Sequence, residues 1–587
     1  MAATWRATGT RLLHRYHARK AARTAIDTRF VTPPEPRTIG HFARGRQLVN
    51  GNILLGGTFT QSPDAVIWDI HPDTPLVVDE AHGCTWLDDL AAVGDIGARA
   101  CAQRWVMDWI DRYGDGTGPG WTPALTGRRL IRWIAHGSFL LRGQPPETAA
   151  RLFTSLGQQT LFLSRRWPAT PPGLGRFEAL TGVILAGLAL EGLSSVVAPA
   201  TAALSRDCVR QIDAGGGIAS RNPEELLEVF TLLTWAFEAL GAAGQQPAAP
   251  LRDALRRIAP TLRALRHVDG GLARFHGGGR GIDGRLDHAL ADSKVRAAQP
   301  HPEDLHMGFA RLAAGRTSLI ADAAAPPAGT DSDNAHASTL AIEIASGRRP
   351  LIVNCGSGRS FGADWRRQGR VTAAHSTVCL ADTSSSVLAA PRNPGLQAAT
   401  LIDIPRTVHF AFSPLEDGKR LEMSHDGYVP RFGLTHARVI DLAGDGRSLV
   451  GEDYLAAVSD PDKRLFDKAK IGRAAGLPYT IRFHLHPDVD AHVDLGGGAV
   501  SMVTKSGEVW VFRHDGQAQL TLERSAYLES GRLKPRNTQQ VVLSGHALDY
   551  ASRVRWSLAK AQDTPDVVRD LGTGGSTASY RSTRKGP

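Results

Sequence analysis

The chain has 587 residues, which is too long for one hydrophobic core, because single cores stop growing at roughly 250 to 300 residues. We therefore expect two principal domains. Hydrophobic residues at 42% and charged residues at 21% are ordinary values and exclude a disordered or collagen-like protein. The net charge of +10 suggests a polyanionic partner, but residues 1–46 hold ten Lys and Arg against two acidic residues. The body is nearly neutral, so we expect no nucleic-acid partner.

Residues 1–46 are predicted to form a basic N-terminal arm. Aromatic and aliphatic residues stand at helical spacing among its arginines: Trp5, Leu12, Tyr16, Ile26 and Phe30. This pattern is typical of a helix that lies on an anionic membrane face, and peripheral membrane contact through the arm is one expectation. The alternative is a basic helix docked on its own domain.

Location is predicted from what the chain does and does not contain. No apolar run of the length of a signal peptide follows the early charges. The apolar run at 179–190 falls short of the roughly 18 residues that span a membrane, and it predicts a buried helix. Five widely spaced cysteines form neither a disulfide framework nor a CxxC metal site. These features favour a cytoplasmic protein.

The first half of the body is predicted to be helical. From about residue 84 to 266 the apolar residues follow helical periods in segments separated by Gly and Pro. Successive helices joined by short connections predict a toroid or bundle of helical hairpins, and we assign residues 47–320 to an α/α toroid. A small, Pro-rich run, "ADAAAPPAGTDSD" at 321–333, predicts a domain connection.

The second half is predicted to be antiparallel β. In "TLAIEIA", Leu340, Ile342 and Ile344 alternate with Ala341 and Glu343, which predicts a half-buried strand with Glu343 on its polar face. Similar short runs recur to about residue 557, and we assign residues 334–560 to an antiparallel β-sandwich. Residues 561–587 have the composition of a disordered tail.

Four sequence runs in the β half point to a known family. The runs "AHASTLAIEIASGRRPLIVNCG", "WRRQGRVTAAHSTVCLADTSSS", "HDGYVPRFGLTHARVIDLAGDGRSLVGED" and "FHLHPDV" resemble the heparinase II/III family of polysaccharide lyases. The resemblance extends over about 170–545. It implies a toroid followed by a β-sandwich, and β-elimination of uronate-containing acidic polysaccharides in a cleft between them. It also implies the cell envelope or periplasm as an alternative location.

The same resemblance implies a structural zinc beneath the cleft. Its ligands would be two histidines and an Asp on an intervening strand, and the corresponding residues here are His336, His375 and Asn354. Two imidazoles suit zinc, whereas a neutral amide is a poor replacement for a carboxylate. The alternative is a pair of histidines hydrogen-bonded in a polar layer between the domains.

β-Elimination needs a group that neutralises the uronate carboxylate, a base that removes the C5 proton and an acid that protonates the departing oxygen. The chain departs from the family at each of these places. The toroid run "LGRFEALTGVILAGLA" lacks the Asn-His pair that active members carry, and Phe275 stands where the resemblance implies a catalytic Tyr. A further catalytic His is replaced by Asn334.

The remaining residues predict a rearranged site. We assign catalytic roles to His276 as base, Tyr428 as acid and Arg274 as carboxylate neutraliser. Six residues are assigned to substrate binding: Arg221, Asn222, Arg176, Glu178, Asn334 and Arg370. Two other roles stay open, because Arg221 precedes "NP" and could cap the following helix, and Tyr428 could be a packed β aromatic.

Three functions remain open from the sequence. The first is a polysaccharide lyase of heparinase II/III type that acts on an acidic polysaccharide or oligosaccharide. The second is a non-catalytic polysaccharide-binding or envelope-assembly protein that has lost the catalytic Tyr and Asn-His pair. The third is a glycoside hydrolase with paired carboxylates, for which Glu178 and Asp269 would have to meet in one cleft.

Overall fold

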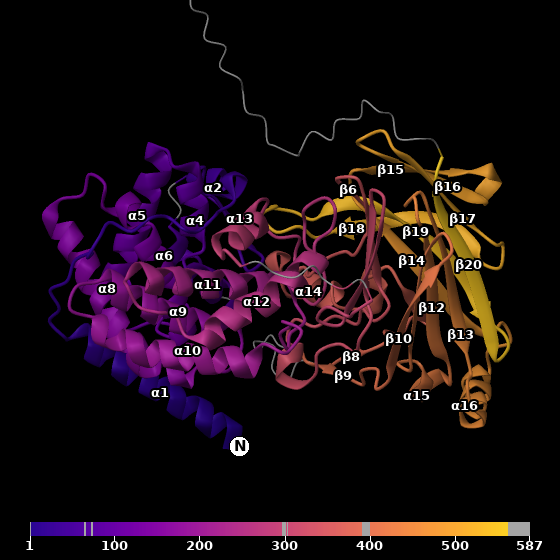
Figure 1. The fold of residues 1–587 in the computed structure, drawn as a ribbon, viewed down its shortest axis with the longest axis horizontal. Helices are drawn as coiled ribbons and strands as arrows, with labels where there is room; N and C mark the ends of the chain where they lie inside the picture. The colour runs from indigo at the N-terminus through magenta and orange to yellow at the C-terminus, as the bar shows by residue number, and fades with distance from the viewer. Residues whose placement is uncertain are drawn as a thin grey trace, which may run out of the picture.

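The computed structural model describes residues 2–63, 66–71, 74–295, 301, 303–389 and 399–561, with side chains described from residue 8 onward. A helical half and a β half lie side by side along the longest axis (Figure 1). The predicted disordered tail lies outside the described residues from residue 562 onward. No described helix combines the length and apolar character needed to cross a membrane.

The N-terminal half is built almost entirely of helices. Its helices are α1 Ala2–Ala22, α2 Phe42–Val49, α3 Pro75–His82, α4 Trp86–Val93, α5 Ile96–Tyr113, α6 Pro123–Ala135, α7 Gly137–Leu141, α8 Pro146–Arg166, α9 Leu174–Ala189, α10 Val197–Gln211, α11 Pro223–Ala242, α12 Ala249–Ala264 and α13 Arg285–Asp292. One small hairpin joins them, made of β1 Asn52–Leu55 and β2 Thr58–Gln61.

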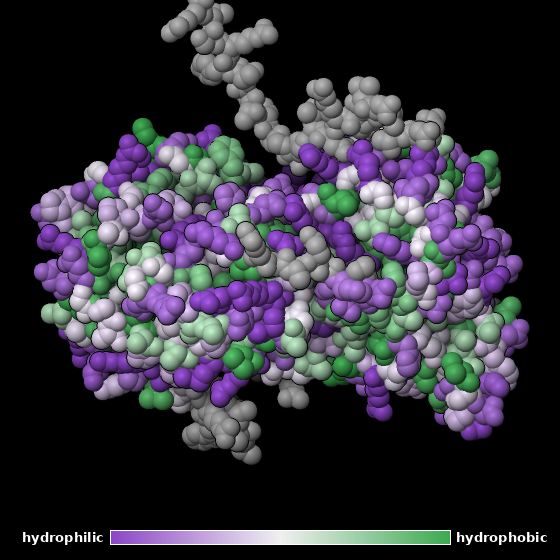
Figure 2. All heavy atoms as spheres, in the orientation of Figure 1, coloured by the Kyte–Doolittle hydropathy of each residue, from purple (hydrophilic) through white to green (hydrophobic). Residues whose placement is uncertain are grey.

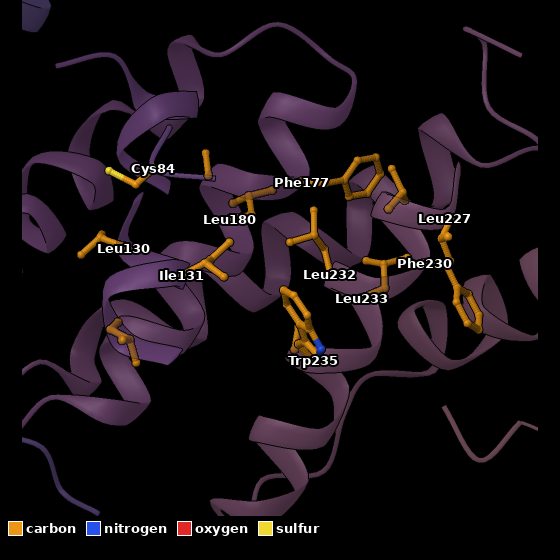
Figure 3. Close-up of a cluster of buried hydrophobic side chains, with 14 of the residues drawn as sticks. Cys84, Leu130, Ile131, Phe177, Leu180, Leu227, Phe230, Leu232, Leu233 and Trp235 are labelled. Atoms are coloured by element: carbon orange, nitrogen blue, oxygen red, sulfur yellow. The ribbon is translucent and has the colours of Figure 1, made fainter. Parts of the chain in front are cut away.

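Helices α6, α9 and α11 form the centre of the toroid, and Figure 3 shows their side chains meeting in one apolar cluster. Gly127 lets α6 approach α9, because a Cβ at this position would lie 2.6 Å from the Cα of Ala179. The apolar run at 179–190 falls largely in α9, whose side chains are mostly buried, which confirms the predicted buried helix. Thr122 caps α6 by accepting a hydrogen bond from the Leu125 N–H, so the start of this inner helix is defined by its own sequence.

Helix α1 docks along α8 at the lower edge of the toroid in Figure 1. Ala18 and Ala21 are buried against the body, and the Arg166 guanidinium donates a hydrogen bond to the His14 ring. Leu12, Leu13 and Tyr16 point outward and are 50–59% exposed. The helix is therefore docked on its own domain through one face, and its other face carries apolar side chains among arginines. Peripheral membrane contact stays a prediction.

The C-terminal half consists of two large antiparallel sheets that share one hydrophobic core. One sheet has the order β10-β11-β12-β13-β20-β17-β16-β15, and the other has the order β18-β19-β14-β6-β5-β4-β3, with β7 paired to β14. The strands are β3 Phe309–Ala314, β4 Thr317–Asp322, β5 Ile342–Ser346, β6 Arg349–Val353, β7 Val378–Leu380, β10 Val408–Leu415, β11 Gly418–His425, β12 Thr435–Ala443, β13 Ser448–Ala456, β14 Leu477–Leu485, β15 Val489–Asp494, β16 Ala499–Thr504, β17 Val509–His514, β18 Gln519–Tyr527, β19 Arg536–Ala547 and β20 Ala551–Lys560. The pair β8 Val387–Leu388 and β9 Leu401–Ile402 and the short helices α14 Ala363–Gln368, α15 Val429–Phe432 and α16 Asp460–Lys470 complete this half.

The predicted boundary between the domains is wrong. Residues 309–322 form the hairpin of β3 and β4, which pairs with β5 at the edge of the second sheet, so the β half begins before residue 320. The predicted linker at 321–333 starts inside β4, and residues 329–332 form a short 3-10 turn. The hairpin escaped prediction because its apolar residues, Leu312, Leu319 and Ile320 among them, do not alternate strictly with polar ones, since β4 is buried on both faces.

Candidate functional site

The candidate site lies where the loop after α12 meets the first strands of the β half. His276 stands in this loop with a positive φ of 48°, and it is completely buried. The following Gly277 also has a positive φ, and a Cβ there would lie 2.7 Å from the Cβ of Asn334. The loop can therefore pack tightly against the segment that carries Asn334 and His336.

Three buried histidines are joined across this interface. The His336 backbone N–H donates to His276 Nδ1 at 3.1 Å, and the Gly277 N–H donates to His336 Nε2 at 3.0 Å. His336 Nδ1 lies 2.9 Å from His375 Nε2, and His375 Nδ1 lies 2.8 Å from the Val371 carbonyl oxygen. These partners assign a single consistent set of protons, in which His375 donates to Val371 and His336 donates to His375.

The buried carboxylate of Asp322 lies at the same interface and pairs with the positive charge of the Arg221 guanidinium. Asp322 Oδ1 accepts a hydrogen bond from the Arg221 guanidinium at 2.6 Å, and Asp322 Oδ2 accepts one from the Ser338 hydroxyl at 2.7 Å. His276 Nε2 lies 3.3 Å from Asp322 Oδ2, but its orientation falls short of a good hydrogen bond. The same guanidinium donates to the carbonyl oxygens of four residues of the β half: Met307, Gly308, Ala324 and Ala325. Arg221 therefore fastens the toroid to the β half.

Arg274 forms a second interdomain attachment. Its guanidinium donates to the carbonyl oxygens of Asn354, Cys355 and Leu528, and it lies 4.0 Å from the centroid of the Tyr527 ring. Its backbone N–H donates to Glu343 Oε2 at 3.0 Å. Each polar group of this arginine is thus directed at the protein itself, which leaves it poorly placed to neutralise a substrate carboxylate.

Burial sets the protonation of the site. Burial lowers the pKa of His375 to about 4, and burial together with the neighbouring histidines holds the pKa of His336 well below its usual range. Burial also lowers the pKa of His276, against the opposing effect of Asp322. Burial alone would raise the pKa of Asp322, but Arg221 and His276 outweigh it and hold this pKa well below normal. At neutral pH the histidines are therefore uncharged and Asp322 is ionised.

The predicted substrate-binding residues of the toroid do not face one open cleft. Asn222 caps α11 by accepting hydrogen bonds from the Glu224 and Glu225 N–H groups, so the cap is Asn222 and not Arg221. Arg176 pairs with Asp207 at 2.9 Å.

Glu178 pairs with Arg128 at 2.7 Å, and Arg128 also binds Asp79. Asp79 in turn accepts a hydrogen bond from Arg359 of the β half. The second carboxylate of the predicted hydrolase pair, Asp269, instead lies 3.7 Å from Arg280, so each of the two has its own cationic neighbour.

The predicted residues of the β half are also engaged within the protein. Asn334 Oδ1 accepts a hydrogen bond from Arg366, and the Arg370 guanidinium donates to the carbonyl oxygens of Ser332 and Ala335. Tyr428 is buried, its hydroxyl donates to the Val378 carbonyl, and burial raises its pKa well above normal. Tyr428 is therefore a packed β aromatic, and the prediction that it is a catalytic acid is wrong.

The residues at the implied zinc position do not fit a metal. Both Nε2 of His336 and Nε2 of His375 already accept hydrogen bonds, and Asn354 Oδ1 accepts one from the Ser376 N–H at 2.9 Å. Within the part of the chain that the structure describes, no three His, Cys, Asp or Glu side chains are grouped so that they could hold a metal ion. The arrangement matches the alternative of histidines hydrogen-bonded in a polar layer.

Sequence reasoning missed the two carboxylates that organise the site. Asp322 was assigned to a linker and Glu343 to a polar strand face, yet both are buried. Glu343 accepts hydrogen bonds from Asn354 Nδ2 and the Arg274 N–H, and it lies 3.4 Å from His267. The sequence feature that could have revealed a buried carboxylate was the charge of Glu343 inside an otherwise apolar run.

Comparisons with known proteins agree with this architecture. Residues 298–557 match the sequence model of the family "Heparinase II/III-like, C-terminal". A crystal structure of heparinase III superposes with a TM-score of 0.66 at 12% identity, with 93% of this chain and 90% of that chain covered. A mutant of the heparan sulfate lyase HepC from Pedobacter heparinus superposes with a TM-score of 0.54 at 14% identity, with 94% and 88% covered. The fold is therefore that of the toroid and β-sandwich polysaccharide lyases.

One relative shares more sequence with the chain than these structures do. The chain is 31% identical over 542 residues to the FtsZ-localized protein C of Caulobacter vibrioides (strain NA1000 / CB15N), with 90% of each chain covered. The chain belongs to the heparinase II/III family. The relative's name states a location in the cell and no lyase activity.

Replacing Arg221 should destabilise the joint between the domains. In Arg221→Ala the buried Asp322 loses its guanidinium partner, and breaking a buried pair in this way costs roughly 3–5 kcal/mol. Urea denaturation followed by tryptophan fluorescence measures the change in the free energy of unfolding. Arg367→Ala, at an exposed arginine of α14, is the control and should change it by less than about 0.5 kcal/mol. Equal effects of the two variants would contradict the role given to Arg221.

Proposed function

We propose that the chain is a non-catalytic member of the heparinase II/III family that uses the inherited fold for binding and assembly. One observation carries this proposal: His276, Arg221 and Arg274, three residues of the site predicted from the sequence, bind other parts of the protein where the two domains meet. His276 is completely buried, and Arg221 and Arg274 direct their guanidinium groups at backbone carbonyls. A substrate would have to replace these contacts before any of the three could act on it.

The chemistry of β-elimination supports the same conclusion. A base must reach the C5 proton of the uronate, at hydrogen-bond distance. Phe275, at the position of the family's tyrosine, is buried and carries no proton that it could exchange. Asn334, at the position of a catalytic histidine, is bound by Arg366. The retained His276 has its Nδ1 occupied by the His336 N–H, so it lacks a free acceptor for a substrate proton.

One pocket between the domains is too small for a sugar ring. A cavity lined by toroid residues, including Arg44, Asn52 and Glu80, and by Ser360 and Arg532 of the β half has a volume of about 20 Å³. This volume suits about one water molecule.

The relative's name suggests what the fold is used for. Because the likeness to the FtsZ-localized protein C extends over nine tenths of both chains, we propose that this protein also localises with FtsZ. Basic α1 suggests a second contact, with an anionic membrane surface. Leu12, Leu13 and Tyr16 stand exposed beside Arg11, Arg15 and Arg19, a combination that suits shallow insertion into lipid headgroups. Such contacts would place the protein at the cytoplasmic side of the cell envelope.

An acidic polysaccharide is the second candidate partner. The solved structures that share the fold are named heparinase III and heparan sulfate lyase, and both names describe enzymes of acidic polysaccharides. Such a polysaccharide would bind the outer surface of the protein and would not be cleaved. Figure 2 shows hydrophilic side chains over much of one face of both halves, which suits a polar ligand of this kind.

The protein should not cleave uronate polysaccharides. Incubation with heparin, heparan sulfate, hyaluronan, alginate and an extracted envelope polysaccharide should produce no ultraviolet absorbance from unsaturated uronate ends. Heparinase III is the positive control, and His276→Ala should give the same absence of signal as the parent chain. A rise in absorbance that disappears in His276→Ala would establish a lyase and reject the non-catalytic proposal.

Immobilised FtsZ should bind the protein in biolayer interferometry, because the proposal carries over the association that the relative's name describes. Heparinase III shares the fold at 12% identity and serves as the matched control, which should not bind. Equal binding of both proteins, or binding of neither, would reject the association with FtsZ.

Vesicles with anionic lipid should bind the protein, and vesicles of neutral lipid should bind it less. The triple variant Leu12→Glu, Leu13→Glu, Tyr16→Glu should lose most of this binding in flotation, because it places charges on the face that inserts. The matched control is Val458→Glu with Ile471→Glu, at positions of the β half that are 72% and 78% exposed. Loss of binding in the control alone would show that the membrane contacts a different surface.

A further inference from the structure

The residues His336, His375 and Asn354, at the place where the family resemblance implies zinc, have their polar side-chain atoms engaged in hydrogen bonds within the protein. We infer that this set is a metal-independent joint of the two domains, and that Asn354 is the residue that makes it so. The inference does not depend on the proposed function, because it concerns what the joint holds and not whether the protein is an enzyme.

The histidines leave no lone pair for a metal. A nitrogen that binds zinc must be deprotonated and must point at the ion. His336 Nε2 accepts the Gly277 N–H, so its proton resides on Nδ1 and is donated to His375 Nε2. The proton of His375 resides on Nδ1 and is donated to the Val371 carbonyl. All four ring nitrogens are therefore used in bonds to the protein.

The distance between the rings agrees with this assignment. Two nitrogens that share a tetrahedral zinc lie about 3.3 Å apart, as follows from Zn–N bonds of about 2.0 Å. His336 Nδ1 and His375 Nε2 are 2.9 Å apart, which is the ordinary length of a hydrogen bond with one proton between them. The bond links two segments that follow β4 and β6 in the chain, and the Gly277 N–H extends it to the toroid.

Asn354 completes the joint in a way that an Asp could not. Its Nδ2 donates to Glu343 Oε1 at 3.1 Å, and its Oδ1 accepts from the Ser376 N–H. An amide can donate and accept at once, whereas an ionised carboxylate only accepts. Glu343 also accepts hydrogen bonds from the Arg274 N–H and the Asn354 N–H, so both of its oxygens act as acceptors. An Asp at 354 would therefore place two carboxylates against each other inside the protein.

The first experiment measures metal in the natural chain. The full protein, purified without chelator and with zinc in the growth medium, should contain far less than about one zinc ion per chain by mass spectrometry. A strong chelator should leave its melting temperature unchanged. About one zinc per chain, or a fall in melting temperature with chelator, would overturn the inference.

The second experiment tests the role given to Asn354. Asn354→Asp without metal should melt at a lower temperature than the parent chain, because the new carboxylate faces Glu343. Added zinc should restore it and should be retained at about one ion per chain, since the new carboxylate supplies the missing anionic ligand. Zinc would then replace the hydrogen bond between His336 Nδ1 and His375 Nε2, and the His336 proton would move to Nε2. Asn334→Asp is the matched control, because Arg366 faces that position, and it should neither lose stability nor take up zinc.

A third variant separates a true site from loose binding. In the double variant Asn354→Asp with His336→Gln one imidazole is missing, so zinc uptake should disappear. Uptake that persists in the double variant, or that fails in Asn354→Asp alone, would overturn the assignment of Asn354 as the deciding residue.

Discussion

The arrangement of the two halves depends on how the negative charge of one buried carboxylate, Asp322, is neutralised. Asp322 has no exposed surface and stays ionised, so it must be paired across the interface between the two halves. The Arg221 guanidinium provides the opposite charge, and the same group binds four backbone carbonyls of the β half. Arg221 comes from the loop before α11, so this pair, together with Arg274 and the Asp79–Arg359 bond, holds the toroid against the β half. The relative position of the halves then determines what the histidines can contact.

The histidine chain and the Glu343 network follow from that position. Once the loop at 274–277 is pressed against the β half, the Arg274 N–H reaches Glu343 and the Gly277 N–H reaches His336. In a lyase the same region would have to admit water and a sugar. Here the Arg274 and Gly277 N–H groups find acceptors within the protein, whereas His276 Nε2 lacks a good hydrogen bond. Phe275, Asn334 and Asn354 are among the positions at which the chain departs from the residues that the family resemblance implies.

The exposed surface includes a face of α1 that could contact other molecules. α1 combines a docked face with an outward face on which Leu12 and Tyr16 stand among arginines, and it projects from the body at one edge (Figure 1). The pocket lined by Arg44, Glu80 and Arg532 has room for about one water molecule.

The sequence by itself determined the two-domain architecture, because helical periods and alternating periods record which face of each element is buried. It also determined that the lyase chemistry is altered, since Phe275 cannot carry a proton and Asn354 cannot supply a charge. Only the tertiary structure decided the roles of Asp322 and Glu343. The alternation in β5 predicts a strand with Glu343 toward solvent, whereas all five residues of β5 are buried, because the toroid covers the face that the pattern leaves open. The spacing of apolar residues shows which sides of one helix or strand are apolar. Contacts between distant elements decide whether its polar side faces water or another domain.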